Sequence, residues 1–170
     1  MRAGESRGVF TLRNLDIVAE MEPVYEYVHD LIESLTHVYE NHEHYEGAQL
    51  ALYELFENAV KYSASNPPEK IRFSFRVNHL QSCIMIRNKC VSIENISALT
   101  RAIDEINMSP EGDTLYQARM RELFENPYQD RVRLGLLRIV VEAGFRLRYL
   151  KSKKFIEVIA IKKNQLRGGE

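Results

Sequence analysis

Hydrophobic residues recur along this chain with two different periods, and each period predicts one type of element. Between residues 50 and 63 they return at the spacing of one helical face, at Leu52, Leu55, Phe56, Ala59 and Val60. Residues 24–38 show the same spacing, and Pro23 stands where proline is favoured in the first turn of a helix. Both segments are therefore expected to be amphipathic helices, with their hydrophobic faces packed against a sheet.

Alternating hydrophobic and polar residues predict the strands. Residues 71–77 alternate strictly, whereas residues 80–86 are hydrophobic on both faces, which is typical of a strand in the middle of a sheet. The two are expected to form an antiparallel hairpin. Residues 145–149 and 155–161 predict the last two strands, and residues 9–12 predict a short opening strand.

Further helices are predicted in the second half of the chain. Ser92 is a candidate N-cap for a helix that ends near Asn107, and Gly144 is a natural C-terminal stop for a later helix. Between these two helices, residues 107–130 contain the pattern of a shorter amphipathic helix. Residues 162–170 are expected to be a frayed tail.

The composition indicates one globular domain of 170 residues. A net charge of -1 argues against nucleic acid or an anionic membrane surface as the main partner. No hydrophobic run approaches the roughly 20 residues that span a bilayer, and the N-terminus lacks a signal-peptide core. Cys83 and Cys90 do not make a disulfide framework, so a reduced, cytoplasmic setting is expected.

Three histidines precede the helix of residues 50–63, at His37, His42 and His44. Histidine-rich tracts can bind metal, but this spacing matches no closed metal site. A solvated helix end is the favoured interpretation.

The candidate chemistry lies on the helix of residues 50–63, where Glu54, Asn58 and Lys61 share the face opposite the hydrophobic stripe. A carboxylate and a carboxamide at i and i+4 are neighbours that can hold one metal ion or one water. The simpler alternative is a solvated helix face. The order of residue types favours a site, because Glu54-x-x-x-Asn58-Ala-x-Lys61-Tyr-Ser63 resembles the N-box of the GHKL ATPases. This superfamily contains histidine-kinase catalytic domains and anti-sigma-factor serine kinases.

The resemblance implies a role for each of these residues. In the superfamily, the Asn ligates the Mg²⁺ carried by ATP, the Glu is the general base, and a Lys or His contacts phosphate. Carried over to this chain, Glu54 would be the catalytic base, Asn58 the Mg²⁺ ligand and Lys61 a phosphate contact.

Two further motifs of the superfamily are degenerate here. After the strand of residues 80–86, the superfamily has Asp-x-Gly, whose Asp binds the adenine amino group. Asn88 takes the Asp position and Cys90 the Gly position, which narrows the expected adenine pocket. Of the glycine-rich G2 box, Gly-x-Gly-Leu-Gly-Leu, only Gly135 survives, and Arg131 and Arg133 replace the first two glycines. These arginines either hold phosphate by their charge or block the loop, and the sequence leaves both open.

The order of the elements resembles the GHKL fold over nearly the whole chain. It implies a single α+β domain over residues 1–170, a two-layer sandwich with a mixed, mostly antiparallel sheet and helices on one face. Residues 107–130 lie where the superfamily has its ATP lid. Within the superfamily, the SiaB-type bacterial protein kinases show the most similar pattern, carried by Asn88, Ile106-Asn107, Tyr116, Met120, Leu134-Gly135-Leu136 and Tyr149.

This resemblance implies a bacterial signalling regulator that binds ATP and Mg²⁺. Its expected activity is phosphorylation of a Ser or Thr on a small partner of the anti-sigma-factor-antagonist (STAS-like) kind, and a homodimer is a further expectation. The alternative is a catalytically degenerate module that kept the fold, lost the nucleotide and acts by docking a partner. A histidine-kinase fragment is disfavoured, because no pair of dimerisation helices with a phosphoacceptor His is evident.

Overall fold

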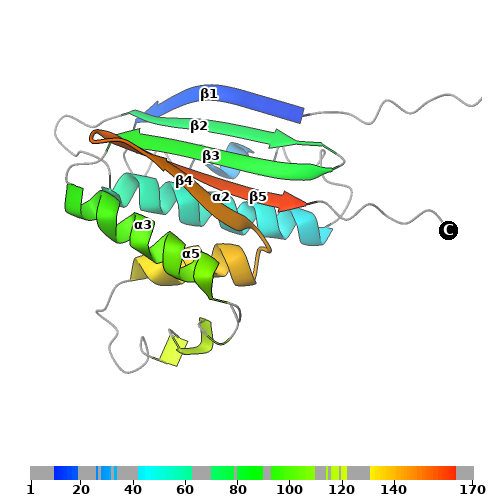
Figure 1. Ribbon diagram of the computed structural model, residues 1–170. Coiled ribbons are helices and arrows are strands. Elements are labelled where there is room, and N and C mark those ends of the chain that lie inside the picture. The colour runs from blue at the N-terminus through cyan, green and yellow to red at the C-terminus, as the bar shows by residue number, and fades with distance from the viewer. Residues whose placement is uncertain are drawn as a thin grey trace, which may run out of the picture.

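The sheet is the frame of the molecule, and all its described strands run antiparallel to their neighbours (Figure 1). The computed structural model describes residues 10–18, 26, 28–31, 33, 42–62, 70–78, 80–89, 93–109, 114, 116–118, 120–121 and 131–163. The strands are β1 (Phe10–Val18), β2 (Lys70–Val77), β3 (Gln81–Lys89), β4 (Arg146–Lys151) and β5 (Phe155–Lys163), in the spatial order β1-β2-β3-β5-β4. The predicted hairpin and the central place of its second strand are confirmed.

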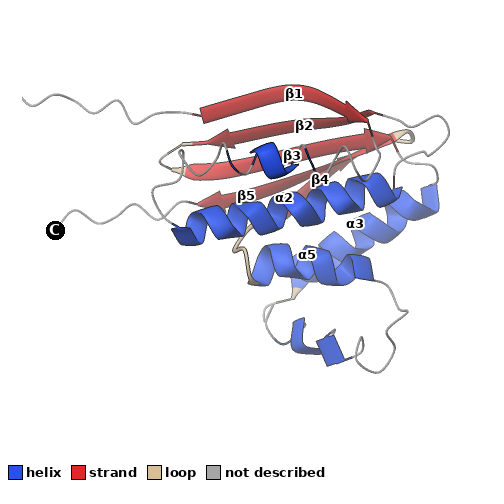
Figure 2. Ribbon diagram, turned by 180° about the vertical axis from the view of Figure 1, so that it is seen from behind, coloured by secondary structure: helices blue, strands red, loops and turns tan. Residues whose placement is uncertain are grey.

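The helices α2 (His42–Tyr62), α3 (Ile93–Met108) and α5 (Arg131–Val141) lie together on one face of the sheet. Figures 1 and 2 show this arrangement from opposite sides, with the strands forming one layer and the helices the other. The predicted α+β sandwich, with an antiparallel sheet and helices on one face, is therefore confirmed. None of the described helices is both long and apolar enough to cross a membrane.

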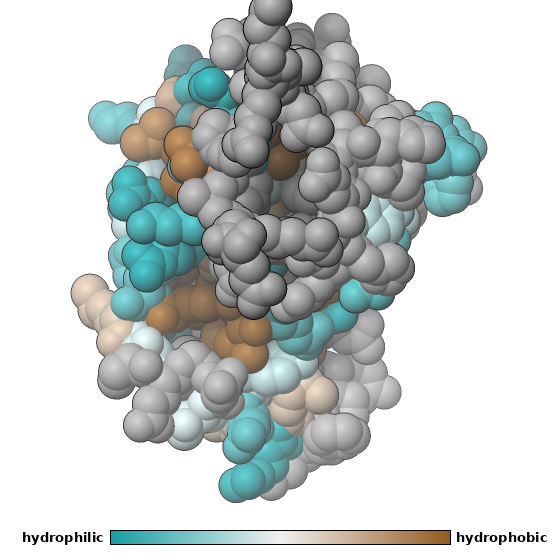
Figure 3. Space-filling view, turned by 90° about the vertical axis from the view of Figure 1, so that its right-hand side faces the viewer, coloured by the Kyte–Doolittle hydropathy of each residue, from teal (hydrophilic) through white to brown (hydrophobic). Residues whose placement is uncertain are grey.

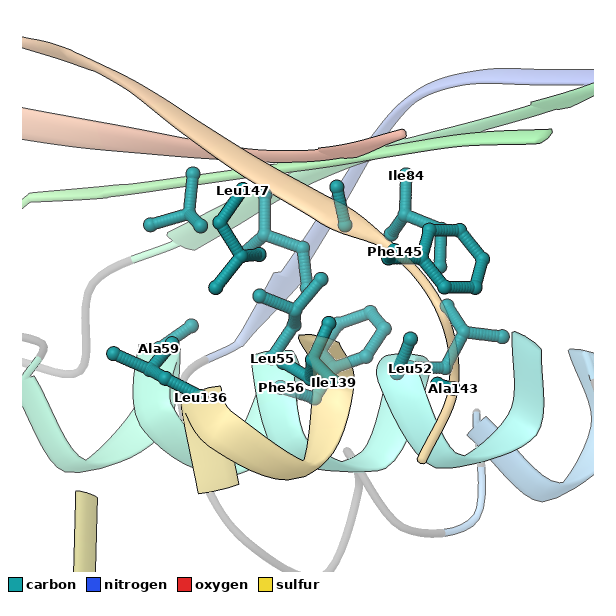
Figure 4. Close-up of a cluster of buried hydrophobic side chains, with 14 of the residues drawn as sticks. Leu52, Leu55, Phe56, Ala59, Ile84, Leu136, Ile139, Ala143, Phe145 and Leu147 are labelled. Carbon is teal, nitrogen blue, oxygen red and sulfur yellow. The ribbon is translucent and has the colours of Figure 1, made fainter. Parts of the chain in front are cut away.

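The hydrophobic stripe of α2 provides the middle of the core. Figure 4 shows its side chains beneath those of the sheet, with α5 contributing beside them. The rings of Phe56 and Phe73 lie 5.0 Å apart, centroid to centroid, and both are buried. Val28 and Leu31, from the predicted helix of residues 24–38, are also in the core, and their backbone is helical.

Several boundaries differ from the prediction. α2 begins at His42 rather than near Leu50, because its early turns are packed through small residues such as Ala48 instead of a hydrophobic stripe. β1 continues to Val18, and a register shift between Leu12 and Leu15 breaks the period of two that would have revealed it. β5 extends to Lys163, so the first two residues of the predicted tail are strand.

Gly144 ends the α5 segment as predicted, with φ at 72°. The N–H groups of Ala143 and Phe145 donate to the carbonyls of Arg138 and Ile139 at 3.0 Å, which closes the helix end. The chain then enters β4. Seen from this end of the molecule, hydrophobic residues gather near the middle of the view, with hydrophilic residues on either side (Figure 3).

The helix α3 is fastened to β4 by two polar contacts. The Asn107 amide donates to the Leu147 carbonyl at 3.0 Å, and the Tyr149 hydroxyl donates to Asp104 at 2.9 Å. α3 itself ends at Met108, one residue beyond its predicted end. In the lid-like segment, residues 114, 116–118 and 120–121 are helical; Ser92 and Cys90 lie outside the described residues.

Candidate functional site

Two residues of the polar face of α2, Glu54 and Asn58, are covered by α5 rather than by solvent. The contact is closest at Gly135, where an added Cβ would lie 2.3 Å from Oε2 of Glu54 and 3.8 Å from Nδ2 of Asn58. Only a residue without a Cβ leaves the Glu54 carboxylate where it is. The packing of the helices therefore explains the glycine at position 135, because it lets the backbone of α5 pass beside the Glu54 carboxylate.

Glu54 is paired with a residue that the sequence analysis did not select. The Arg138 guanidinium donates from Nη1 to Oε1 of Glu54 at 2.5 Å, and the Glu54 side chain is only 13% exposed. Arg138 also donates from Nε to the Glu142 carboxylate at 3.3 Å, and the Tyr116 hydroxyl donates to that same carboxylate. These contacts form a chain from α2, through α5, to Tyr116 in the lid-like segment.

Burial dominates the electrostatics of Glu54. Desolvation raises the pKa of its carboxyl above the ordinary 4.5, the Arg138 charge lowers it, and the Glu57 charge raises it again, with a net rise. The hydrogen bond to Glu142 likewise raises the pKa of Tyr116. A carboxyl with a raised pKa is a suitable proton acceptor when its site lies close to the reacting hydroxyl.

The raised pKa of Glu54 predicts how the stability of the protein depends on pH. Because the folded protein binds the Glu54 proton more tightly than the unfolded chain, the stability that Glu54 contributes is complete below pH 4.5 and is lost as the pH rises through the raised pKa. The Glu54→Gln variant has no ionisable group at this position, so its stability does not fall for this reason as the pH rises. Its free energy of unfolding, minus that of the wild type, is therefore expected to increase from acidic to neutral pH in urea titrations.

The slope of that difference is the readout, because it reports the net pKa shift of Glu54, in which the attraction of Arg138 is already included. A flat difference for Glu54→Gln across this pH range would contradict the prediction.

Asn58 and Asn88 lie at a small pocket between α2, β3, α3 and α5. Asn58 is 9% exposed, and its Nδ2 has no hydrogen-bond partner among the described residues. Asn88, at 4% exposure, is the penultimate residue of β3, and its Nδ2 donates to the Ala59 carbonyl at 3.3 Å. The remaining walls are apolar, formed by Leu55, Ala59, Ile86, Leu99, Leu136 and Val158. The space holds about one water molecule.

The structure thus brings together Glu54, Asn58, Asn88 and Gly135. Lys61, one turn beyond Asn58, is exposed, and its Nζ lies 5.9 Å from the centroid of the Tyr62 ring. Arg131 and Arg133 begin α5, but their side chains lie outside the described residues. His37 lies outside them too, as do the side chains of His42 and His44. In the part of the chain that is described, no three His, Cys, Asp or Glu residues are grouped to hold a metal.

The residues of the site have chemistry that suits a nucleotide, but the pocket between them is too small for one. The Asn58 Nδ2 is a buried donor that costs free energy unless a ligand supplies an acceptor. A Mg²⁺ ion would be held by the other end of this carboxamide, its oxygen. Apolar walls with a few fixed polar groups are typical of sites for planar ligands. The pocket, however, holds about one water, so a nucleotide does not fit into it in this arrangement of the helices.

Arg138 was missed because its partner is distant in the sequence. The pair Arg138 and Glu142 could be read from the i, i+4 spacing on one helix, and the structure places that pair at 3.3 Å. The contact of Arg138 with Glu54 joins two helices, and no local pattern indicates it.

The protein is an α+β sandwich with a buried polar site. The site lies where α5 packs against α2, the helix that covers the sheet. No model of a protein family matches the sequence, and no curated protein matches it. Among solved structures, a chain of the crystal structure of the SiaB–SiaC complex from Pseudomonas aeruginosa is similar, with a TM-score of 0.67 and 15% sequence identity over 89% of each chain. The chain therefore has a SiaB-like fold.

Proposed function

We propose that this protein is a bacterial signalling regulator that binds ATP and Mg²⁺ between α2, β3 and α5. In this proposal it phosphorylates a Ser or Thr on a small partner protein of the anti-sigma-factor-antagonist (STAS-like) kind. The observation that carries the proposal is the buried, unpartnered amide of Asn58, beside Asn88 in an apolar pocket. The SiaB-like fold supports it, since the similar solved structure is a complex of two proteins.

Each residue of the site has a task in this proposal. Glu54 accepts the proton of the acceptor hydroxyl, and its raised pKa suits that task. Asn58 holds Mg²⁺ through its carboxamide oxygen, and Asn88 presents its oxygen to an exocyclic amine of the base. Lys61, Arg131 and Arg133 supply positive charge for phosphate oxygens. The bound metal spreads the charge that develops on the transferred phosphoryl group.

Arg138 has a positioning task in the same proposal. As long as its guanidinium holds Oε1 of Glu54, the carboxylate is engaged and α5 is closed on α2. Admission of the nucleotide requires α5 to move, which separates Arg138 from Glu54 and frees the base. The Glu54 side of this pair is largely buried, so nucleotide binding has to supply the free energy of separating the two groups.

A second function is favoured by the same ion pair. If α5 stays closed, with Gly135 against Glu54, the protein is a degenerate GHKL-fold module that docks a partner without nucleotide. Cys83, a free thiol, is consistent with the reducing cytoplasm that both functions assume.

Calorimetric titration with ATP and Mg²⁺ tests the first function against the second. Wild-type protein should bind, and Asn88→Ala should bind at least about tenfold more weakly, since one lost hydrogen bond in a buried site costs about 1.4 kcal/mol. Asn107→Ala is the matched control, because its amide also donates to a backbone carbonyl, that of Leu147, and the bond ties α3 to β4.

The control should bind nucleotide as the wild type does. Circular dichroism verifies that each variant is folded before titration. Absence of heat with folded wild-type protein at millimolar nucleotide would exclude the first function and leave the docking module.

A further inference from the structure

The sheet has a second face, on which no described helix lies (Figures 1 and 2). Cross-strand registers order its side chains into rows that run from β2 through β3 and β5 to β4. One row is Arg76, Cys83, Ile161 and Arg146, and the next is Ser74, Met85, Ile159 and Arg148. We call this surface the open face. It is separated by the whole sheet from Glu54 and Asn58.

The open face has an apolar centre between two cationic margins. Its centre consists of Cys83, Met85, Ile159 and Ile161, all of which are partly exposed. Arg76 on β2 and Arg146 and Arg148 on β4 are exposed on either side of that centre. Hydrophobic side chains surrounded by a charged rim are the arrangement of protein–protein interfaces, in which Met and Arg are enriched.

The open face is more positively charged than the chain as a whole. The next row is Arg72, Arg87, Glu157 and Leu150, in which Glu157 already accepts a hydrogen bond from Nε of Arg87 at 2.9 Å. On β1, the register places Asp16 opposite Arg72, so this third row contains acids beside its arginines. The two rows described first contain three arginines and no acid between β2 and β4, although the whole chain has a net charge of -1.

We infer that the open face is a docking surface for a protein with an apolar patch flanked on both sides by acidic side chains. β2 and β4 are three strand spacings apart, so the two cationic margins are separated by about 14 Å. We expect the acidic groups of the partner to be separated by the same distance as the two cationic margins. The inference goes beyond the proposed kinase function, and it does not depend on nucleotide binding.

Other occupants fit the same face less well. Single-stranded nucleic acid binds on several aromatic side chains, whereas the two central rows here contain only Ser, Cys, Met, Ile and Arg. The aromatic residue described at the end of this face, Phe155, is already covered by the Arg87 guanidinium. Two copies of this chain, joined through the open face, would bring the arginine margins of one against those of the other. An acidic protein surface satisfies both the centre and the margins.

The test uses a synthetic β-hairpin peptide with an Ile and Val face flanked by glutamates, labelled with fluorescein and titrated by anisotropy. The same peptide with lysine for glutamate and a poly-dT oligonucleotide are the comparison ligands. We expect the glutamate peptide to bind at least about tenfold more tightly than either of the others, with lower affinity at high salt.

Charge reversal locates the binding on the protein. Arg146→Glu/Arg148→Glu should weaken binding of the glutamate peptide at least about tenfold, and Arg76→Glu, on the opposite margin, should weaken it independently. Arg101→Glu, at an exposed position on α3, is the matched control and should leave the affinity unchanged. If the double variant does not fold, Arg76→Glu alone decides.

Several results would overturn the inference. They are equal binding of the two peptides, tighter binding of poly-dT, or no effect of charge reversal on either margin. Self-association in analytical ultracentrifugation that the double variant abolishes would instead assign the open face to a second copy. Because all titrations are run without nucleotide, their failure is distinguishable from a failure of the ATP titration.

Discussion

The Asn58→Leu variant is expected to be more stable than the wild type by about 1–3 kcal/mol and to bind no nucleotide. The gain arises because burying an amide without a hydrogen-bond partner costs about that much, and leucine has no such group. The pocket walls around position 58 are mostly aliphatic, and leucine has the same number of non-hydrogen side-chain atoms as asparagine, so it fits there without an unpaired polar group. Urea unfolding followed by circular dichroism measures the change.

Asn107→Leu is the matched control for this gain. Its amide donates to the Leu147 carbonyl at 3.0 Å, so the same substitution removes a hydrogen bond and should cost about 1 kcal/mol. If Asn58→Leu loses as much stability as Asn107→Leu does, Asn58 is an ordinary structural residue. The opposite signs, if observed, identify Asn58 as a residue kept at the expense of stability, which is typical of functional sites.

Phe73→Ala is expected to lower the free energy of unfolding by about 3–5 kcal/mol. The Phe73 side chain is fully buried in β2, and its ring packs against that of Phe56 on α2 at 5.0 Å. The substitution leaves a cavity at the contact between the two layers, which cannot close without moving the helix. Since domains of this size are stable by about 5–15 kcal/mol, a measurable unfolded fraction should appear without denaturant in the least stable case.

Phe155→Ala provides the comparison for that loss. Phe155 is on the open face of β5, only partly buried, and its ring lies 4.4 Å from the Arg87 guanidinium carbon. Removing it costs the cation–π contact and some burial, about 1 kcal/mol. Equal losses for Phe73→Ala and Phe155→Ala in urea titrations would mean that the core is not between the sheet and α2.

The fold was predictable from the sequence wherever one face of a helix or strand is buried and the opposite face is exposed. The helical stripe of Leu52, Leu55 and Phe56 and the alternation of residues 71–77 both identify a side chain by the face it presents, and the structure buries those faces. Prediction of β1 stopped at Leu12 because a register shift interrupts its period before Leu15. The beginning of α2 was missed because helix packing through small residues leaves no hydrophobic signal.

The site was predictable only in part, since it is assembled from distant segments. Glu54 and Asn58 could be selected from their spacing on one helix, and Gly135 and Asn88 from their resemblance to family motifs. Arg138 could not be selected, because its contact with Glu54 depends on how α5 crosses α2. Lys61 was selected with the other polar residues of its helix, but its exposed ammonium lies by Tyr62 rather than in the pocket.

The contact network of Arg138 gives the lid-like segment a direct connection to the site. Tyr116 holds Glu142, Glu142 holds Arg138, and Arg138 holds Glu54. A partner that displaces Tyr116 would remove one support of this arrangement and so favour the separation of α5 from α2. Nucleotide entry and contact with a partner at residues 107–130 would then be coupled through a small number of hydrogen bonds.

The strand order has a consequence for how the molecule is made. The last strand of the sequence to be synthesised, β5, is inserted between β3 and β4, so neither of these neighbours has its full set of backbone partners until residues 155–163 have left the ribosome. A nascent chain therefore carries an incomplete sheet until β5 is available. Completion of the sheet should be slow, because the β3–β5 pairs are far apart in sequence.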